Sequence, residues 1–336
     1  MSTVAHGGAP AGWLELSANL APHGTPEAVR NAIARASYSA YADLDATAAE
    51  RHLAAESRVD PSWVMLTAGA TEALRLAMDA LIEPGETVVI VGPTYGEYAR
   101  VAARRGARVV EVRARPPDFA VPRALIARTV ARERPRLVVA CDPNNPTGRR
   151  AGRGAWDGVL EALPPMSDLV VDESFLPFAT SDPRGLAGQG RAIVVRSLTK
   201  VLAIPGIRVG YVVAAPAILD RLRVVRDPWA VSAHACAVGA IATWKLDPAV
   251  RAEIARWRDA LSRLFSERDL TPVPSSAPFV LVHAGSRCRP LVDAFGRRRI
   301  AVRRCASFGL PEHIRVAVRP PLDQLRIATV LFEEAW

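Results

Sequence analysis

The chain has 336 residues, half of them hydrophobic, which is enough for a large core and for two domains. The formal net charge is +9, but the excess arginines are scattered without aromatic residues between them, so we expect no nucleic-acid partner. No apolar run approaches the ~18 residues of a membrane span, and the first ten residues lack the basic and apolar regions of a signal peptide.

The first 25 residues show no regular pattern. Residues Pro26 to Ala36 are expected to form a short helix with Thr25 as its N-cap, and Ala46 to Ser57 a second helix. From Trp63 onward, short apolar runs alternate with helical segments. The runs predict seven strands, at Val64–Ala68, Thr87–Val91, Arg108–Val112, Leu137–Cys141, Leu169–Val171, Ile193–Ser197 and Val209–Val213. The helices between them are expected at Thr71–Ile82, Tyr95–Arg105, Pro122–Glu133 and Gly154–Leu163.

Continuous apolar strands separated by helices are typical of a mainly parallel sheet that is buried on both faces. The sequence therefore predicts an α/β fold with a large doubly wound domain at residues 46–245, preceded by an N-terminal arm and small-domain segment at residues 1–45. A smaller C-terminal domain is expected at residues 246–336. The later elements are expected at Pro216–Arg226, Ser232–Lys245, Pro248–Glu267, Phe279–His283, Arg289–Gly296, Ile300–Arg303, Ile314–Val318 and Leu322–Glu334.

The cysteines form no C-x-x-C pair and show no zinc-ligand spacing; they are Cys141, Cys236, Cys288 and Cys305. We therefore expect reduced thiols in a cytoplasmic protein and no metal site. A few of the arginines would bind an anionic small-molecule substrate, and the alanine, arginine and proline bias of a GC-rich genome explains the others.

Lys200 lies among small residues and before a Pro-Gly pair, so we expect it in a loop or turn between two buried strands. A lysine shielded from water has a depressed pKa and can attack a carbonyl as a neutral amine. The alternative is a surface lysine beside a turn.

A small-residue turn, Gly69-Ala70-Thr71, follows the first predicted strand and opens a helix. Free backbone N–H groups and the positive end of the helix dipole make such a turn a phosphate site. The alternative is that Thr71 only caps the helix.

The pattern S-x-T-K-x-x-x-x-P-G-x-R-x-G at residues 197–210 resembles the lysine motif of the class I/II aminotransferase family, the pyridoxal 5'-phosphate (PLP) enzymes of fold type I. The P-N-N-P-T-G segment at residues 143–148 and the strand-ending Asp172 also resemble that family, and they occur in its order. The resemblance covers nearly the whole chain. It implies a large domain with a mainly parallel seven-stranded sheet, a small α/β C-terminal domain, and PLP as the cofactor.

The same resemblance assigns roles around the cofactor. Lys200 would form the internal Schiff base, Asp172 would face the pyridine nitrogen, and Tyr95 would stack on the ring. Asn145 would donate to the phenolic O3′. The phosphate would be held by Gly69, Ala70, Thr71, Ser197, Thr199 and Arg208, and by Tyr41 from the neighbouring subunit of a homodimer.

For the substrate, the resemblance assigns the α-carboxylate to Arg315, because a guanidinium fork matches a planar carboxylate. Arg319 would follow it on the same strand face. His6 and Asn19 are the further substrate-binding candidates.

Four features resemble the threonine-phosphate decarboxylases of cobalamin biosynthesis: His6-Gly7-Gly8, Leu16-Ser17-Ala18-Asn19, Phe175 where many aminotransferases carry a tyrosine, and Ala203–Gly206 with Pro228–Ser232. Ala21 and Ser232 stand where that family has asparagines. The sequence thus predicts decarboxylation of O-phospho-L-threonine to aminopropanol phosphate.

The alternative within the fold is an aminotransferase of the histidinol-phosphate type that uses 2-oxoglutarate, or a relative with a changed substrate. The alternative from another class is a non-catalytic PLP-fold regulator that binds DNA. The presence of Lys200, Asp172 and Asn145 argues against a non-catalytic protein.

Overall fold

The computed structural model describes residues 7–180, 182, 185–333 and 335–336. Within them, the largest sheet has seven strands in the order β2-β8-β7-β6-β5-β3-β4. Only β8 runs antiparallel to its neighbours, β2 and β7. This confirms the predicted mainly parallel sheet. The strands are β2 (Val64–Thr67), β3 (Thr87–Gly92), β4 (Arg108–Arg113), β5 (Leu137–Cys141), β6 (Asp168–Asp172), β7 (Ala192–Ser197) and β8 (Gly210–Val213).

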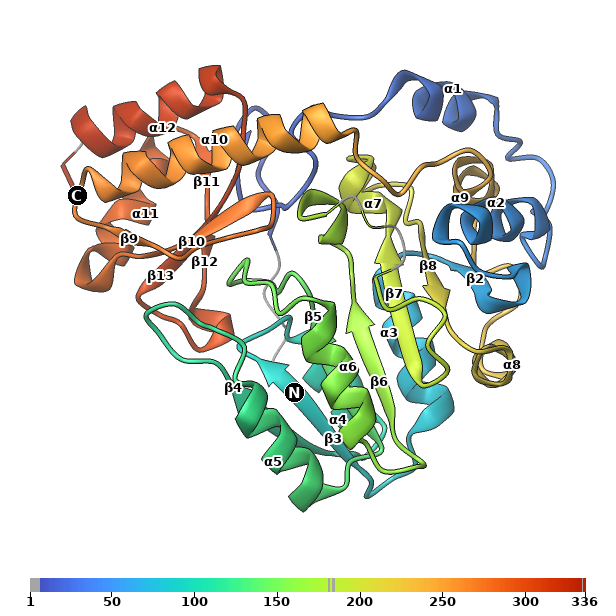
Figure 1. Ribbon diagram of the computed structural model, residues 1–336. Coiled ribbons are helices and arrows are strands. Elements are labelled where there is room, and N and C mark those ends of the chain that lie inside the picture. Colours follow the sequence, from blue (N-terminus) through green and yellow to red (C-terminus); the bar gives the residue numbers. More distant parts are fainter. Residues whose placement is uncertain (1–6, 181, 183–184, 334) are drawn as a thin grey trace.

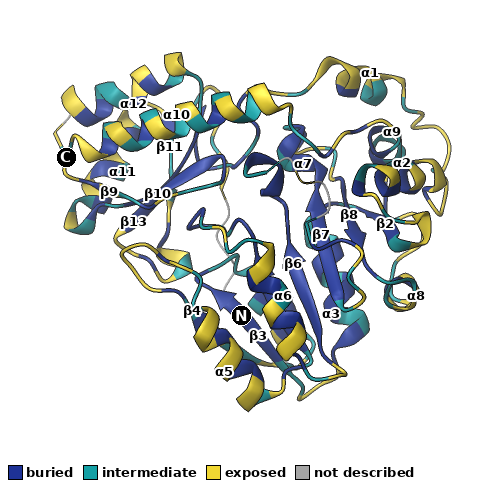
Figure 2. Cartoon of the chain, in the orientation of Figure 1, coloured by how far each residue is buried: buried dark blue, intermediate teal, exposed yellow. Residues whose placement is uncertain are grey.

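Helices cover both faces of this sheet (Figure 1), as continuous apolar strands require. The side chains of α3, α4 and α8 pack in the core on one face. Those of α1, α2, α5, α6 and α9 pack in the core on the other. The bounds are α1 (Glu27–Arg35), α2 (Thr47–Ser57), α3 (Ala70–Leu81), α4 (Glu97–Arg104), α5 (Arg123–Glu133), α6 (Arg153–Ala162), α8 (Pro216–Val224) and α9 (Ala233–Gly239). In Figure 2 the central strands are buried throughout, whereas the outer faces of α5 and α6 are exposed.

The C-terminal part builds a second, antiparallel sheet in the order β12-β13-β10-β9. Its strands are β9 (Thr271–Pro272), β10 (Phe279–His283), β12 (Arg303–Arg304) and β13 (His313–Ala317). Three helices accompany it: α10 (Pro248–Ser266), α11 (Cys288–Arg297) and α12 (Pro321–Glu333). A short parallel pair, β1 (Leu14–Glu15) with β11 (Ile300–Ala301), ties the N-terminal segment to this part. The predicted domain boundaries at residues 45/46 and 245/246 stay a prediction.

Four local predictions were wrong. Lys200 lies in a short helix, α7 (Leu198–Val201), and not in a loop. The expected strand at Ile300–Arg303 is split, because its first half pairs with β1 and the next strand with β13. The N-cap of α1 is Pro26, while the Thr25 hydroxyl donates to the Ala203 carbonyl at 3.1 Å.

The fourth wrong prediction concerns the length of α9, which ends at Gly239 instead of reaching Lys245. After that point the Thr243 hydroxyl donates to Glu56 at 2.8 Å and accepts from the Lys245 backbone, so local side-chain bonds replace helical ones. Among the described helices, none is long and apolar enough to cross a membrane.

Candidate active site

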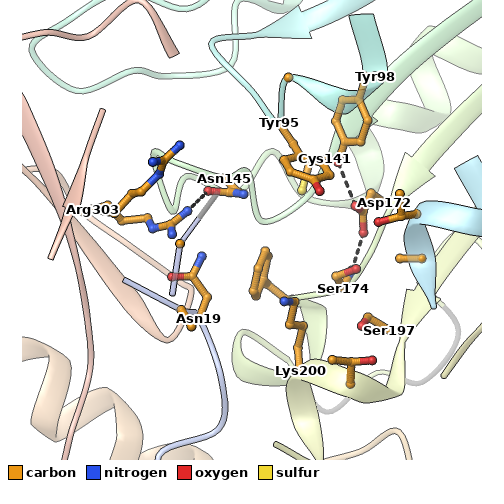
Figure 3. Close-up of a pocket in the computed structure, with 18 of the residues that line it drawn as sticks. Asn19, Tyr95, Tyr98, Cys141, Asn145, Asp172, Ser174, Ser197, Lys200 and Arg303 are labelled. Atoms are coloured by element: carbon orange, nitrogen blue, oxygen red, sulfur yellow. Dashed lines mark hydrogen bonds between the residues drawn. The ribbon is translucent and has the colours of Figure 1, made fainter. Parts of the chain in front are cut away.

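A cavity of about 260 Å³ lies where the carboxyl ends of β5, β6 and β7 face the small sheet and the N-terminal segment. This is the edge at which doubly wound sheets bind ligands. Figure 3 shows its labelled side chains, with Lys200 and Ser197 on one side and Asn145 and Arg303 on another. The cavity is lined by Gly7, Ser17, Ala18, Asn19, Ala70, Thr71, Leu74, Tyr95, Gly96, Tyr98, Cys141, Asn145, Asp172, Ser174, Phe175, Ser197, Thr199, Lys200, Arg208, Arg303, Ser307, Phe308 and Arg315.

Lys200 is held at the cavity by α7, which directly follows β7. Its backbone carbonyl accepts a hydrogen bond from the Ala21 N–H at 2.9 Å, so the N-terminal segment fixes this turn of the chain. Burial lowers the pKa of Lys200 to about 8, and the positive charges of Arg315 and Arg208 add to the effect. A larger share of the amine is therefore neutral near pH 7 than for an ordinary lysine, as a nucleophile and base requires.

Asp172 ends β6 and is buried. Its Oδ2 accepts from the Tyr98 hydroxyl at 2.8 Å and its Oδ1 from the Ser174 N–H at 2.9 Å. Both bonds are drawn in Figure 3. Burial raises the pKa of Asp172, while these hydrogen bonds and the charge of Lys200 oppose the rise by stabilising the carboxylate.

The turn that the sequence predicts to bind a phosphate lies at the start of α3. Gly69 precedes the helix with a φ of +85°, and a Cβ there would lie 2.8 Å from Nη2 of Arg208. Glycine therefore suits the left-handed backbone conformation, and its lack of a side chain leaves room for the guanidinium. Ala70, Thr71, Ser197, Thr199 and Arg208 all line the cavity beside this turn. The Thr199 hydroxyl donates to the Val209 carbonyl at 3.1 Å, which leaves its oxygen only as an acceptor toward a ligand that donates.

Tyr95 and Asn145 lie across the cavity from Lys200 (Figure 3). The Tyr95 ring is half-buried and packs edge-on against Tyr98, with 5.7 Å between the ring centroids. The Asn145 Oδ1 accepts from Nη1 of Arg315. Because that oxygen is engaged, the Asn145 amide N–H₂ is the group that can donate to a ligand.

Arg315 lies in the middle of β13 and is buried. Besides its bond to Asn145, it donates from Nη2 to the Ser17 carbonyl at 2.6 Å. Asn19 lines the same cavity and is buried, and among the residues that the structure describes its Oδ1 has no hydrogen-bond partner. A buried amide oxygen in a cavity wall can accept a hydrogen bond from a ligand or from water.

Two other predicted residues that the structure describes, Arg319 and Tyr41, do not line this cavity. Arg319 lies beyond the end of β13 and donates to the Glu15 carbonyl at 2.9 Å. The strand alternation that would have placed Arg319 beside Arg315 does not extend past Ala317. Tyr41 is 81% exposed and lies against the Trp229 ring, with 4.6 Å between centroids. His6 is outside the described residues.

Sequence reasoning missed Arg303, which stands directly opposite Arg315 in the β12–β13 pair. Its Nη2 donates to the Ser307 hydroxyl at 2.9 Å, and its guanidinium lies 5.6 Å from the centre of the Phe308 ring. Cross-strand partners project to the same face of a sheet, so the pair brings two guanidinium groups to one end of the cavity. The signal was the antiparallel register, which the sequence alone does not display.

Glu15 was also missed. One of its carboxylate oxygens accepts from the Ser17 N–H at 2.5 Å, the Ser17 hydroxyl at 2.6 Å and the Ala18 N–H at 3.0 Å. These bonds fix the backbone that presents the Ser17 carbonyl to Arg315 and the Asn19 side chain to the cavity. The position of Glu15 at the end of the short strand β1 does not by itself reveal these hydrogen bonds.

The donor set of this cavity fits PLP. A helix N-terminus with a glycine kept clear for Arg208 suits the phosphate, and a buried carboxylate suits a protonated ring nitrogen. Lys200, with its depressed pKa, suits the aldehyde carbon, and the free Asn145 amide N–H₂ suits an oxygen substituent.

The sequence model of the family described as aminotransferase class I and II matches residues 11–331. The histidinol-phosphate aminotransferase of Symbiobacterium thermophilum is 33% identical over 325 residues, covering 95% of this chain and 89% of that protein. The enzyme of that name from Moorella thermoacetica is 32% identical over 317 residues, covering 91% of this chain and 81% of that protein.

Solved structures of PLP-dependent enzymes share the fold of this chain. The histidinol-phosphate aminotransferase from Sinorhizobium meliloti, in complex with pyridoxal-5'-phosphate, has a TM-score of 0.85 at 26% identity and covers 95% of this chain and 89% of its own. The L-threonine-O-3-phosphate decarboxylase from Porphyromonas gingivalis has a TM-score of 0.79 at 22% identity, covering 94% of this chain and 97% of its own. At that identity, the second likeness is evidence of the fold alone.

Proposed function

The chain belongs to the class I and II aminotransferase family, whose cofactor is PLP, and from that premise we propose that it is an aminotransferase of the histidinol-phosphate type. It would move the amino group of a phosphorylated amine to 2-oxoglutarate. The observation that carries the proposal is the likeness, over more than nine-tenths of the chain, to two proteins of that name at 33% and 32% identity. The sequence analysis predicted decarboxylation and gave transamination as the alternative. The names of the relatives favour transamination instead.

The cavity supports an anionic substrate. Arg303 and Arg315 stand opposite each other on neighbouring strands, and both line the cavity. A phosphate or carboxylate placed between two guanidinium groups gains charge-assisted hydrogen bonds from both. Asn19 adds an amide whose oxygen has no partner in the described part of the chain, and this oxygen is suited to a donor on the substrate.

PLP, when bound, supplies an electron sink for a bond at the amine-bearing carbon. Lys200, largely neutral above its pKa of about 8, would take up the proton released from that carbon. Asp172, held by Tyr98 and Ser174, would face the ring nitrogen and stabilise a proton there. The Asn145 amide N–H₂ would donate to the oxygen substituent of the ring, and Arg315 would bind the substrate anion.

A second candidate is decarboxylation of O-phospho-L-threonine. It is favoured by Phe175, which lines the cavity where many aminotransferases carry a tyrosine, and which packs edge-on against Phe279 at 5.2 Å. The two departures from the decarboxylase pattern do not line the cavity of this chain. Ala21 bonds to the Lys200 carbonyl through its backbone, and Ser232 caps α9 by accepting from the Ala235 N–H at 3.2 Å.

One experiment separates the two. The holoenzyme is mixed with histidinol phosphate and then with 2-oxoglutarate, while the cofactor absorbance is recorded and glutamate is measured. The proposal expects conversion of the cofactor to its amine form and stoichiometric glutamate. Release of CO₂ from O-phospho-L-threonine without a 2-oxo acid, and no glutamate with histidinol phosphate, would establish the second candidate instead.

We also propose a homodimer in which Tyr41 contacts the cofactor phosphate of the neighbouring subunit. Tyr41, Tyr38 and Trp229 are exposed apolar rings, at 81%, 91% and 49%, and Tyr41 does not line its own cavity. Light scattering is expected to give the mass of a dimer, and Tyr41→Phe to weaken PLP binding without changing that mass. A monomeric holoenzyme with full activity would disprove this arrangement.

A further inference from the structure

Tyr98 is a buried residue of α4 that touches two members of the cofactor site. It is 1% exposed, and its ring packs edge-on against Tyr95 with an interplanar angle of 86°. Its hydroxyl donates to Oδ2 of Asp172 at 2.8 Å. One side chain thus connects Tyr95, the expected ring-stacking residue, to Asp172, the carboxylate expected to face the ring nitrogen; Figure 3 shows the three side chains together.

The Asp172 carboxylate depends on its hydrogen-bond donors, because burial disfavours its charged form. The Oδ1 atom takes a backbone N–H from Ser174, and that donor is present whatever side chain stands there. Among the hydrogen bonds found within the described part of the chain, Tyr98 supplies the side-chain donor to Oδ2. The Ser174 side chain also hydrogen-bonds the carboxylate and helps to lower its pKa. Removal of the Tyr98 hydroxyl would therefore take one of two side-chain donors from a buried charged group, which is costly.

Tyr98 is also suited to remain a donor. Burial raises the pKa of its phenol well above the ordinary range, and the nearby charge of Asp172 raises it further. The hydroxyl therefore keeps its proton throughout any working pH range. It can neither ionise nor compete with Asp172 for the negative charge.

The nearby Phe175 gives this contact more weight. Phe175 lines the cavity and carries no hydroxyl, so it cannot donate to the cofactor oxygen. Control of the ring's electron demand then falls mainly to Asn145 at the oxygen and to Asp172 at the nitrogen.

We propose that Tyr98 is a positioning residue for the cofactor: its hydroxyl holds Asp172 ionised and aimed at the ring nitrogen, while its ring supports Tyr95. The proposal depends on PLP and on the described contacts, and not on which amine the enzyme takes. Its tests therefore need no substrate.

The test is Tyr98→Phe, which removes the hydroxyl and keeps the ring. A hydrogen bond to a charged group is worth about tenfold or more in an equilibrium constant, so the PLP dissociation constant is expected to rise by about that factor. The pH midpoint of the bound cofactor's absorbance change should also rise, because a ring nitrogen that holds its proton less tightly withdraws less charge.

Tyr211→Phe is the matched control. Tyr211 is 0% exposed and packs on the other face of the sheet, where its hydroxyl lies 3.4 Å from the Ser57 hydroxyl. This variant deletes an equally buried hydroxyl, so it should lower the melting temperature of the apo chain to a similar degree. It should leave both cofactor readouts at their original values. Equal shifts in the two variants would mean that Tyr98 acts only through stability and would overturn the proposal.

Two further variants make the result decisive. In the background of Asp172→Asn, adding Tyr98→Phe should change PLP affinity less than about twofold, since the carboxylate it serves is gone. A full additive loss would contradict the proposal. Replacement of Tyr98 by a ring-fluorinated tyrosine keeps the volume and strengthens the donor, so the absorbance midpoint should move in the opposite direction. This second substitution decides the matter even if Tyr98→Phe fails to fold.

Discussion

The two ends of the cavity are built in different ways. At the cofactor end, Gly69, Asn145, Asp172 and Ser197 each lie at or just after the end of a strand of the large sheet, and successive parallel strands deliver them to one edge. At the substrate end, Asn19, Arg303 and Arg315 come from the N-terminal segment and from two antiparallel strands. The first end can be predicted from motif order, whereas the second depends on register and on contacts between distant segments.

The difference also appears in how the side chains are held. Asp172 is fixed by the Ser174 N–H, two residues on, and by the Tyr98 hydroxyl of α4, a helix packed on the large sheet, at 2.9 and 2.8 Å. Arg315 is fixed by acceptors that belong to other segments, the Ser17 carbonyl and the Asn145 amide. Movement of the N-terminal segment would therefore disturb the substrate end first. The cofactor end would lose the Ala21 contact to the Lys200 carbonyl and the Thr25 contact to the Ala203 carbonyl.

The largest expected effect is at the cofactor end. The chain has only two lysines, Lys200 and Lys245, which makes a clean comparison. Lys200→Ala should lower kcat by about 10⁴-fold or more, because the variant loses both the nucleophile and the proton carrier. Lys245→Ala should remain near full activity, since its ammonium lies 3.8 Å from Glu56 away from the cavity. Borohydride reduction of the holoenzyme followed by peptide mass analysis should place PLP on Lys200; label on Lys245 would contradict the site.

The next effect tests the substrate end. Arg315→Gln and Arg303→Gln should each raise KM for a phosphorylated amine by about tenfold to a hundredfold, as expected for lost charge-assisted hydrogen bonds. PLP affinity should change much less. A matched control is Arg319→Gln, whose guanidinium bonds the Glu15 carbonyl outside the cavity. An unchanged KM in the Arg303 variant, measured by initial rates, would remove that residue from the substrate site.

The pH dependence of cofactor binding tests how the charge of Arg315, at the substrate end, affects the pKa of Lys200, at the cofactor end. Recombination of apo enzyme with PLP needs the neutral amine of Lys200, so its rate should rise with pH and level off above about pH 8. Arg315 contributes a positive charge that lowers this pKa. Stopped-flow measurement of Arg315→Gln should therefore show the midpoint moved to higher pH. A midpoint above pH 10 in the unaltered enzyme would refute the lowered pKa.

The smallest expected effect concerns Glu15. Glu15→Gln replaces the carboxylate that accepts three hydrogen bonds from Ser17 and Ala18 with a weaker acceptor. KM should rise by about threefold to tenfold while kcat stays within about twofold, because the residue acts through the backbone that holds Arg315. Glu253→Gln, on the partly exposed face of α10, is a suitable control. A fall in kcat alone would indicate a different role.

The sequence by itself determined the fold and the cofactor. The strand predictions hold within a few residues, because fully buried parallel strands read as unbroken apolar runs such as Leu137–Cys141. Lys200, Asp172, Asn145 and the turn at Gly69 could be placed because each stands at a fixed position relative to such a run. The sequence predicted the reaction less well. Phe175 and the segment around Asn19 resemble the threonine-phosphate decarboxylases, whereas the relatives that match over nine-tenths of the chain are named histidinol-phosphate aminotransferases.

Only the tertiary structure decided the rest. The pairing of Arg303 with Arg315, the split of residues 300–304 between two sheets, and the role of Glu15 all depend on contacts between segments far apart in the chain. The bond from Tyr98 to Asp172 spans 74 residues and joins a helix to a strand end. Local patterns specify elements because they reflect periodic burial, but they carry no record of register or of which buried polar groups meet. Those are set when the elements pack, where each buried donor and acceptor must find a partner.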